Sequence, residues 1–332
     1  MSDDDDFLVS HILTEDEVLV TGLLFADFDE QQIHRCSDRT NRTRFNSKYG
    51  ASPTVICTLY EDLQKSSAVD RSVVPHRIMR LEGSPENFKW LLRSMMYVKK
   101  YPLEDEFEIY FHLTARYAPG QISNVTEKNQ YLKYLKVTWP DDFAFADIWI
   151  MSINGTHIWI EEPSHEIYSM DTDYFSHKFN KAGINYKLGI ALASGWLLWM
   201  NGPFKAGQNY LSIFVQEGLE QRLIHLGKKA IGDSAYKGHE EAVCYPNVCD
   251  SDAVRKFKSR ALKRHEDFNG MTKTFKILRN CFRHGVGKIA AAFESVAVIC
   301  QYKIETDDPL YDILIESVVY GNGDQERVPV ED

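Results

Sequence analysis

Apolar residues recur at helical spacing in two stretches of the first third of the chain. The first stretch follows a turn signal over residues 50–53, and the second follows Pro85, which suits the first position of a helix. The apolar positions are Val55, Ile56, Leu59 and Leu63 in the first stretch and Phe88, Leu91, Leu92, Met95 and Met96 in the second. Each stretch predicts a helix with one buried face, within a helical region over residues 42–140. Residues 1–41 lack such a period, and we expect an acidic, largely disordered tail there with at most one short helix.

From residue 145 the pattern changes to short apolar runs separated by turn signals. Asn154-Gly155 favours a β-turn, and Ser194-Gly195 is a hairpin signal. The expected strands cover residues 148–153, 157–160, 185–192 and 196–201 and a short run that ends at Asp233, and the expected helices cover about 210–223 and 252–283. The pattern therefore predicts an α/β domain over residues 145–315, with a mixed sheet and flanking helices, and an acidic tail over residues 316–332.

Composition narrows the class of protein. With 332 residues, 44% of them hydrophobic and 12% aromatic, the chain can bury one large core or two smaller ones. No window approaches the roughly 18 consecutive apolar residues of a membrane helix, and the first residues, MSDDDDF, are acidic where a signal peptide is basic. The six cysteines are scattered, as is typical of reduced thiols in an intracellular protein. We therefore expect a globular protein that is neither secreted nor inserted in a membrane.

Positive charge is concentrated in one segment of an acidic chain. Eleven Lys or Arg and two acids lie between Arg255 and Lys288, a local charge of +9 in a chain with a net charge of −10. Such a segment can form a basic face that contacts DNA phosphates, and a solvated helix face is the alternative. The candidate DNA-binding residues are Arg255, Lys256, Lys258, Arg260, Lys263 and Arg264.

Three polar residues lie at positions where active-site residues are commonly found. Asp233 follows an apolar run in KAIGDSAYKG, and so lies at the exposed end of a strand, where open α/β sheets place their active sites. Asn154 lies at the expected turn between two runs of a β-rich segment. Glu266 lies on the basic helix, on the side opposite the apolar stripe formed by Phe257, Ala261, Phe268 and Phe275. The alternatives are a turn asparagine and an exposed helix glutamate.

The order of strand residue, strand aspartate and helix glutamate resembles the DDE nuclease site of the Harbinger-type transposases. The motifs YFSHKFNKAGINYKLGIAL, WMNGPFKAGQN and RHEDFNGMTKTFKILRNCFRH carry the resemblance, which covers residues 145–315. It implies an RNase H-like fold that cleaves DNA phosphodiester bonds and transfers strands. By the same resemblance Asn154, Asp233 and Glu266 would hold divalent metal, Mg²⁺ or Mn²⁺, and the partners would be DNA and a separate DNA-binding protein in the nucleus.

One of the three metal-binding acids is replaced. The family has an aspartate in a "V-D-G-T-H"-like turn, where this chain reads Ser152-Ile153-Asn154-Gly155-Thr156-His157. A neutral amide contributes no charge and cannot bridge two cations as a carboxylate can. Asp147 is a poor substitute because it falls on the opposite face of the strand, whereas Asp171 and Asp173 could swing inward. We expect weak metal binding and little or no cleavage.

The family commonly carries a helix-turn-helix-like unit ahead of the nuclease domain, and residues 103–136 have suitable lengths. A recognition helix presents Arg, Lys, Asn or Gln to DNA, yet Pro119 to Leu135 offers few cations beyond Lys128 and Lys133. We therefore expect a degenerate unit that serves mainly in packing.

Three other functions stay open at this point. The chain could be a non-catalytic DNA- or protein-binding module that keeps the basic helix, or an unrelated metal hydrolase. A zinc site at His239, Cys244 and Cys249 is a weaker alternative, because C-x4-C without a second close pair is far from a strong ligand spacing.

Overall fold

The computed structural model describes residues 13–69, 85–102, 149–161, 172–177, 179–311, 313, 315–319 and 325–329. The chain forms two compact units, each described by itself below. A helical unit contains residues 1–136, 275–277 and 291–307, and a sheet unit contains residues 137–274, 278–290 and 308–332. The expected helix-turn-helix-like unit, residues 103–136, lies outside the described residues.

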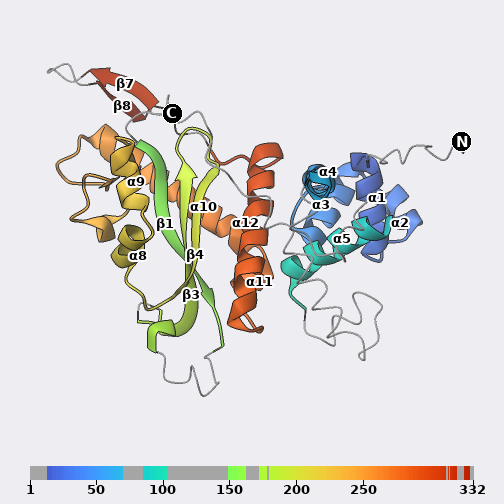
Figure 1. Cartoon of the computed structure of the whole chain (residues 1–332). Helices are drawn as coiled ribbons and strands as arrows, with labels where there is room; N and C mark the ends of the chain where they lie inside the picture. The colour runs from blue at the N-terminus through green and yellow to red at the C-terminus, as the bar shows by residue number, and fades with distance from the viewer. Residues whose placement is uncertain are drawn as a thin grey trace, which may run out of the picture. The chain divides into compact units, whose positions relative to one another are not determined.

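The helical unit is built from α1 to α5 and most of α12 (Figure 1). Their bounds are Glu15–Phe25, Glu30–Arg35, Asp38–Tyr49, Pro53–Val69, Pro85–Lys100 and Ile289–Thr306. Thr14 and Asp29 cap α1 and α2 in capping boxes, and Ser37 caps α3, so each short helix begins with its backbone donors satisfied. The predicted helices over residues 55–63 and 88–96 fall within α4 and α5.

The expectation of a disordered tail is wrong for residues 13–41. Val18 and Leu23 of α1 have no exposed surface, and Phe45 of α3 packs against the backbone of Gly22. Tyr49 also donates a hydrogen bond from its hydroxyl to the carbonyl of Gly22, at 2.7 Å. These helices are therefore part of the core of the helical unit.

The sheet unit has a six-stranded mixed sheet flanked by helices, which confirms the predicted α/β class. The strands are β1 (Trp149–Trp159), β2 (Phe175–Ser176), β3 (Lys181–Ala191), β4 (Leu197–Lys205), β5 (Lys229–Ile231) and β6 (Val243–Cys244). Strand β3 pairs antiparallel with β1, β2 and β4, whereas β5 pairs parallel with both β1 and β6. Strands β7 (Ile315–Val319) and β8 (Gln325–Pro329) pair antiparallel in a separate two-stranded sheet. Except for Ile315, these strands belong to the segment expected as an acidic tail.

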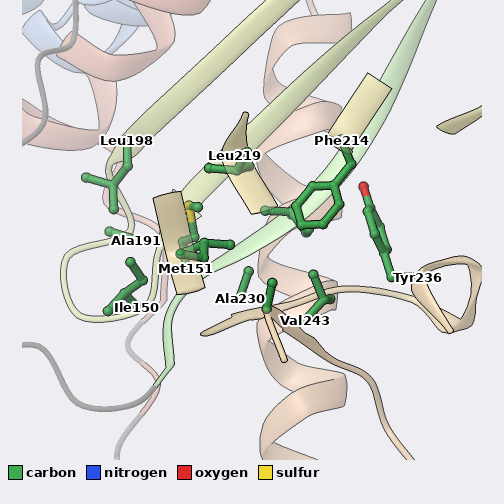
Figure 2. Close-up of a cluster of buried hydrophobic side chains, with 12 residues drawn as sticks. Ile150, Met151, Ala191, Leu198, Phe214, Leu219, Ala230, Tyr236 and Val243 are labelled. Carbon is green, nitrogen blue, oxygen red and sulfur yellow. The ribbon is translucent and has the colours of Figure 1, made fainter. Parts of the chain in front are cut away.

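Helices cover both faces of this sheet (Figure 1). Helices α8 (Tyr210–Gln216) and α9 (Leu219–His225) pack on one face, and Figure 2 shows Phe214 and Leu219 from these helices against Met151 and Ala230 of the sheet. Helix α10 (Asp252–Lys273) covers the other face through Phe257 and Ala261. The second half of β1 and the residue that follows β5 by two positions, Asp233, line a cleft together with α10 and the loop before α8.

Three predicted elements differ from the structure. Asn154-Gly155 is not a turn, because β1 continues through both residues and pairs them with Leu188 and Lys187 of β3. The helix expected over residues 210–223 is divided by Gly218, whose φ of 74° suits glycine. The long helix expected to residue 283 ends at Lys273, and the short helix α11 (Lys276–Arg279) follows.

Candidate functional site

Strand pairing places Asn154 and Asp233 at neighbouring positions. Strands β1 and β5 are parallel, with Ser152 paired to Ile231, and Asn154 and Asp233 each follow this pair by two residues. Strand β5 has already ended there, and Asp233 caps the short 3₁₀ helix η4 (Ser234–Tyr236) by accepting a hydrogen bond from the amide of Ala235 at 2.9 Å. Its carboxylate is exposed at the carboxyl edge of the sheet.

Two buried residues fix α10 against the sheet just before Glu266. Arg264 has no exposed surface and donates to the carbonyls of Leu192, at 2.7 Å, and Ala191. The Nδ1 atom of His265 lies 3.1 Å from the hydroxyl of Ser152 on β1. Burial is the main cause that lowers the pKa of His265 to about 3; a hydrogen bond with the backbone of Ser152 opposes this shift, and the charge of Arg264 adds to it. The imidazole is therefore neutral at pH 7.

These anchors bring Glu266 to Asn154. The amide of Asn154 donates from Nδ2 to Oε1 of Glu266 at 2.6 Å, and its Oδ1 accepts from the backbone amide of Gly155 at 2.7 Å. Because Oδ1 is held by an N–H donor, the amide is oriented with its NH₂ group toward the carboxylate. Asn154 and Glu266 thus form what we call a closed pair, a hydrogen-bonded pair in which both polar atoms of Asn154 are bonded within the protein.

Asn154, Asp233 and Glu266 line one cleft of about 790 Å³. Its walls come from β1, the loops before β3, α8 and η4, and the second half of α10. The lining residues are Asn154, Gly155, Thr156, His157, Trp159, Phe179, Gln208, Asn209, Asp233, Ala235, Glu266, Asn269, Gly270 and Lys273.

This set of side chains does not fit a two-metal site. Both polar atoms of Asn154 and one oxygen of Glu266 are engaged within the protein, and one oxygen of Asp233 serves as a helix cap. Only two carboxylates would face two divalent cations. Among the described residues, no group of three His, Cys, Asp or Glu side chains could hold a metal ion.

Of the three aspartates considered as substitutes, the structure describes Asp173, which does not complete the site. Asp171 and Asp147 lie outside the described residues. Asp173 is not among the residues that line the cleft, and its Oδ2 lies 3.7 Å from Nζ of Lys205. The zinc alternative is not favoured either, because His239, Cys244 and Cys249 all lie in the described part of the chain, where no group of three such side chains could hold a metal ion.

The six candidate DNA-binding residues divide into two groups, and the expectation for Lys258 and Arg264 is wrong. Both are buried, and Nζ of Lys258 lies 2.9 and 3.0 Å from the two carboxylate oxygens of Asp250. Arg255, Lys256 and Lys263 are exposed on α10 and form its outer basic face, and Arg260 is half-buried.

The sequence did not point to Lys273, Trp159 or Phe179, all of which line the cleft. Nζ of Lys273 donates to the carbonyls of His157 and Leu278, the latter at 3.0 Å, and burial lowers the pKa of Lys273 to about 8. The helical spacing could have indicated Lys273. Residues 266, 270 and 273 recur at i, i+4 and i+7, so Lys273 lies on the same side of α10 as Glu266.

Comparison with protein-family models, curated proteins and solved structures found no match for this chain. Within the described part of the chain, no helix combines the length and apolar character needed to cross a membrane.

Proposed function

We propose that the sheet unit is an RNase H-like nuclease domain of the Harbinger-type DDE class, whose catalytic site is disabled and which binds DNA without cleaving it efficiently. The order of strands supports this proposal. An antiparallel run of β4, β3 and β1, followed by the parallel strands β5 and β6, is the arrangement expected for such a sheet. The glutamate-bearing helix packs on the face that carries the first strand residue.

The observation that carries the proposal is the closed pair of Asn154 and Glu266 in the same cleft as Asp233. Three separate elements supply these side chains, as a DDE site requires. An aspartate at position 154 would place a second carboxylate beside Glu266, and a bound cation or a shared proton would be needed to relieve their repulsion. The amide instead satisfies Glu266 directly, so the pair is stable without metal.

The loss of this charge is expected to weaken cleavage strongly. Removal of one preorganised electrostatic group commonly lowers a rate by about 10²- to 10³-fold. The outer basic face of Arg255, Lys256 and Lys263 does not depend on the cleft, so DNA binding can persist when cleavage is lost. The position of this basic face outside the cleft favours a non-catalytic DNA-binding role.

The direct test is a calorimetric titration of Mn²⁺ into native protein and into Asn154→Asp. We expect at least roughly tenfold tighter binding by the variant, because a carboxylate supplies both charge and a bridging oxygen. The gain should disappear when Asp233→Ala is added. Asn209→Asp is the matched control, since Asn209 lines the same cleft but caps α8, a role that aspartate also fills.

Cleavage of supercoiled DNA provides the second measurement. Native protein should show little or no Mn²⁺-dependent nicking, and Asn154→Asp should show more. Efficient nicking by native protein would contradict the disabled site. Equal gains in metal affinity from Asn154→Asp and Asn209→Asp would show that general charge, rather than a DDE arrangement, attracts the ion.

A further inference from the structure

The cleft has two ends of different chemistry. Asn154, Asp233 and Glu266 form its acidic end, whereas His157, Trp159, Phe179 and Lys273 form what we call the aromatic end. On α10, seven residues separate Glu266 from Lys273, which corresponds to roughly 10 Å along the helix axis. The acidic end resembles a nuclease site, but that resemblance leaves the aromatic end unexplained.

The three rings of the aromatic end form one cluster. The rings of His157 and Trp159 are stacked, with centroids 5.8 Å apart and an interplanar angle of 12°. Phe179 meets both rings edge-on, at 5.2 Å from Trp159 and 4.9 Å from His157. The side chain of Phe179 is 40% exposed, so apolar surface at this end of the cleft faces water.

Two local features of the backbone position the rings of Trp159 and Phe179. Trp159 lies opposite Gly183 of β3, where an added Cβ atom would approach the indole to 3.3 Å and the carbonyl of Ile158 to 2.9 Å. The absence of a side chain at Gly183 therefore leaves room for the indole across the strand. Phe179 is carried by the tight loop between β2 and β3, where Asn180 adopts a left-handed conformation with φ of 53°.

Two cations accompany the rings. Nζ of Lys181 lies 5.7 Å from the centroid of the Trp159 ring, and Lys273 lines the cleft itself. An ammonium group has three donors, and Lys273 uses two of them on backbone carbonyls of the described residues. Its remaining donor can serve a phosphate oxygen. Aromatic faces beside ammonium groups are the combination by which proteins bind unpaired nucleotides.

We propose that Trp159 and Phe179 form a stacking site for an unpaired base of single-stranded DNA, with Lys181 and Lys273 beside its phosphates. The inference extends the proposed function, on which it rests for DNA as the ligand. Duplex DNA does not satisfy this site, because its bases are already stacked on each other. Without metal the carboxylates of Asp233 and Glu266 repel phosphate, so the single-stranded DNA would bind at the aromatic end of the cleft.

The test is fluorescence anisotropy of a labelled oligothymidylate, titrated with native protein and variants in buffer that contains EDTA. Base–aromatic stacking strengthens binding by roughly 5- to 100-fold per base, and Trp159→Ala and Phe179→Ala should each lose an amount in this range. Trp159→Phe, which keeps an aromatic face, should recover most of the affinity. Lys181→Gln should lower the salt dependence of binding by about one phosphate contact.

Trp196→Ala is the matched control. Trp196 is 41% exposed and precedes β4, so it lies at the other end of β3 from Gly183 and Trp159. This variant should bind the oligothymidylate as native protein does. Phe179 lies in an exposed loop, so Phe179→Ala tests the site even if Trp159→Ala unfolds, which circular dichroism would show.

Unchanged affinity in Phe179→Ala, or equal affinity of native protein for the single strand and for the matching duplex, would overturn the inference. These measurements exclude metal and do not involve Asn154. Stacking can therefore be observed even if the Mn²⁺ titration contradicts the disabled DDE site. Conversely, a gain of metal affinity in Asn154→Asp without single-strand binding would leave the proposed function standing and remove this inference alone.

Discussion

Lys263 and Arg264 are consecutive cations on α10, and the fold uses them in opposite ways. Lys263 is exposed on the outer basic face, whereas Arg264 is fully buried and donates to the carbonyls of Ala191 and Leu192. The exposed cation can meet a partner in solution. The buried cation holds the helix on the end of β3 and so positions Glu266. A count of charges along the helix does not separate these two roles, but their contacts do.

The largest expected effect is on stability. Arg264→Ala should lower the free energy of unfolding by about 3–5 kcal/mol, because two buried carbonyls lose a charged donor and a cavity remains. Lys263→Ala should change the free energy of unfolding by less than about 0.5 kcal/mol, as is usual for an exposed side chain. Urea unfolding of both variants, followed by circular dichroism, measures the difference. Similar losses in the two variants would mean that Arg264 does not anchor the helix.

The next residue, His265, extends the buried anchor and makes it sensitive to pH. Its pKa is about 3 in the folded protein and 6.5 when exposed, so the unfolded chain binds more protons between these values. Its contribution to stability is complete above pH 6.5 and is lost as the pH falls toward 3. Between pH 7 and pH 5 we expect a loss of roughly 2 kcal/mol.

Urea unfolding at these two pH values tests the assignment. His265→Asn should remove most of the pH dependence, whereas His225→Gln, a change at an exposed histidine of α9, should leave it intact. An unchanged dependence in His265→Asn would assign the effect to other groups.

Much of the sheet unit could be predicted from short apolar runs between turn signals, because strands that helices cover on both faces are apolar along most of their length. The failure at Asn154-Gly155 has a physical reason. Its turn propensity is local, but β1 gains hydrogen bonds to β3 on both sides of this pair, which outweigh that propensity. The helices before residue 42 were missed because α1 has apolar residues on its exposed side, at Val20 and Leu24, as well as in its buried set, and α2 buries a single apolar side chain, Ile33. Neither helix therefore shows a clear helical period.

The candidate site was predictable to a different degree. Positions 154, 233 and 266 follow from strand ends, a helix and a family resemblance, and the structure brings them into one cleft. The burial of Lys258 and Arg264 was not predictable, because Lys258 pairs with Asp250 in the loop before α10 and Arg264 donates to backbone carbonyls. Backbone acceptors leave no mark in a sequence.

The smallest expected effects concern the outer basic face of α10, where each cation contributes little alone. Charge reversal of Arg255, Lys256 and Lys263 to glutamate should weaken duplex DNA binding about tenfold or more at moderate salt. Each lost phosphate contact lowers the slope of log affinity against log salt by about 0.9. The matched control reverses Arg222, Lys228 and Lys237, two exposed cations and one half-buried cation elsewhere in the sheet unit. Both triple variants change the net charge equally, so anisotropy titrations at several salt concentrations separate a local contact from a general repulsion. Equal losses of affinity in the two variants would show that the outer basic face is only solvated, and the charge of this helix would then serve the fold through cations such as Lys258, Arg264 and Lys273, which bind carboxylate or carbonyl oxygens of the protein.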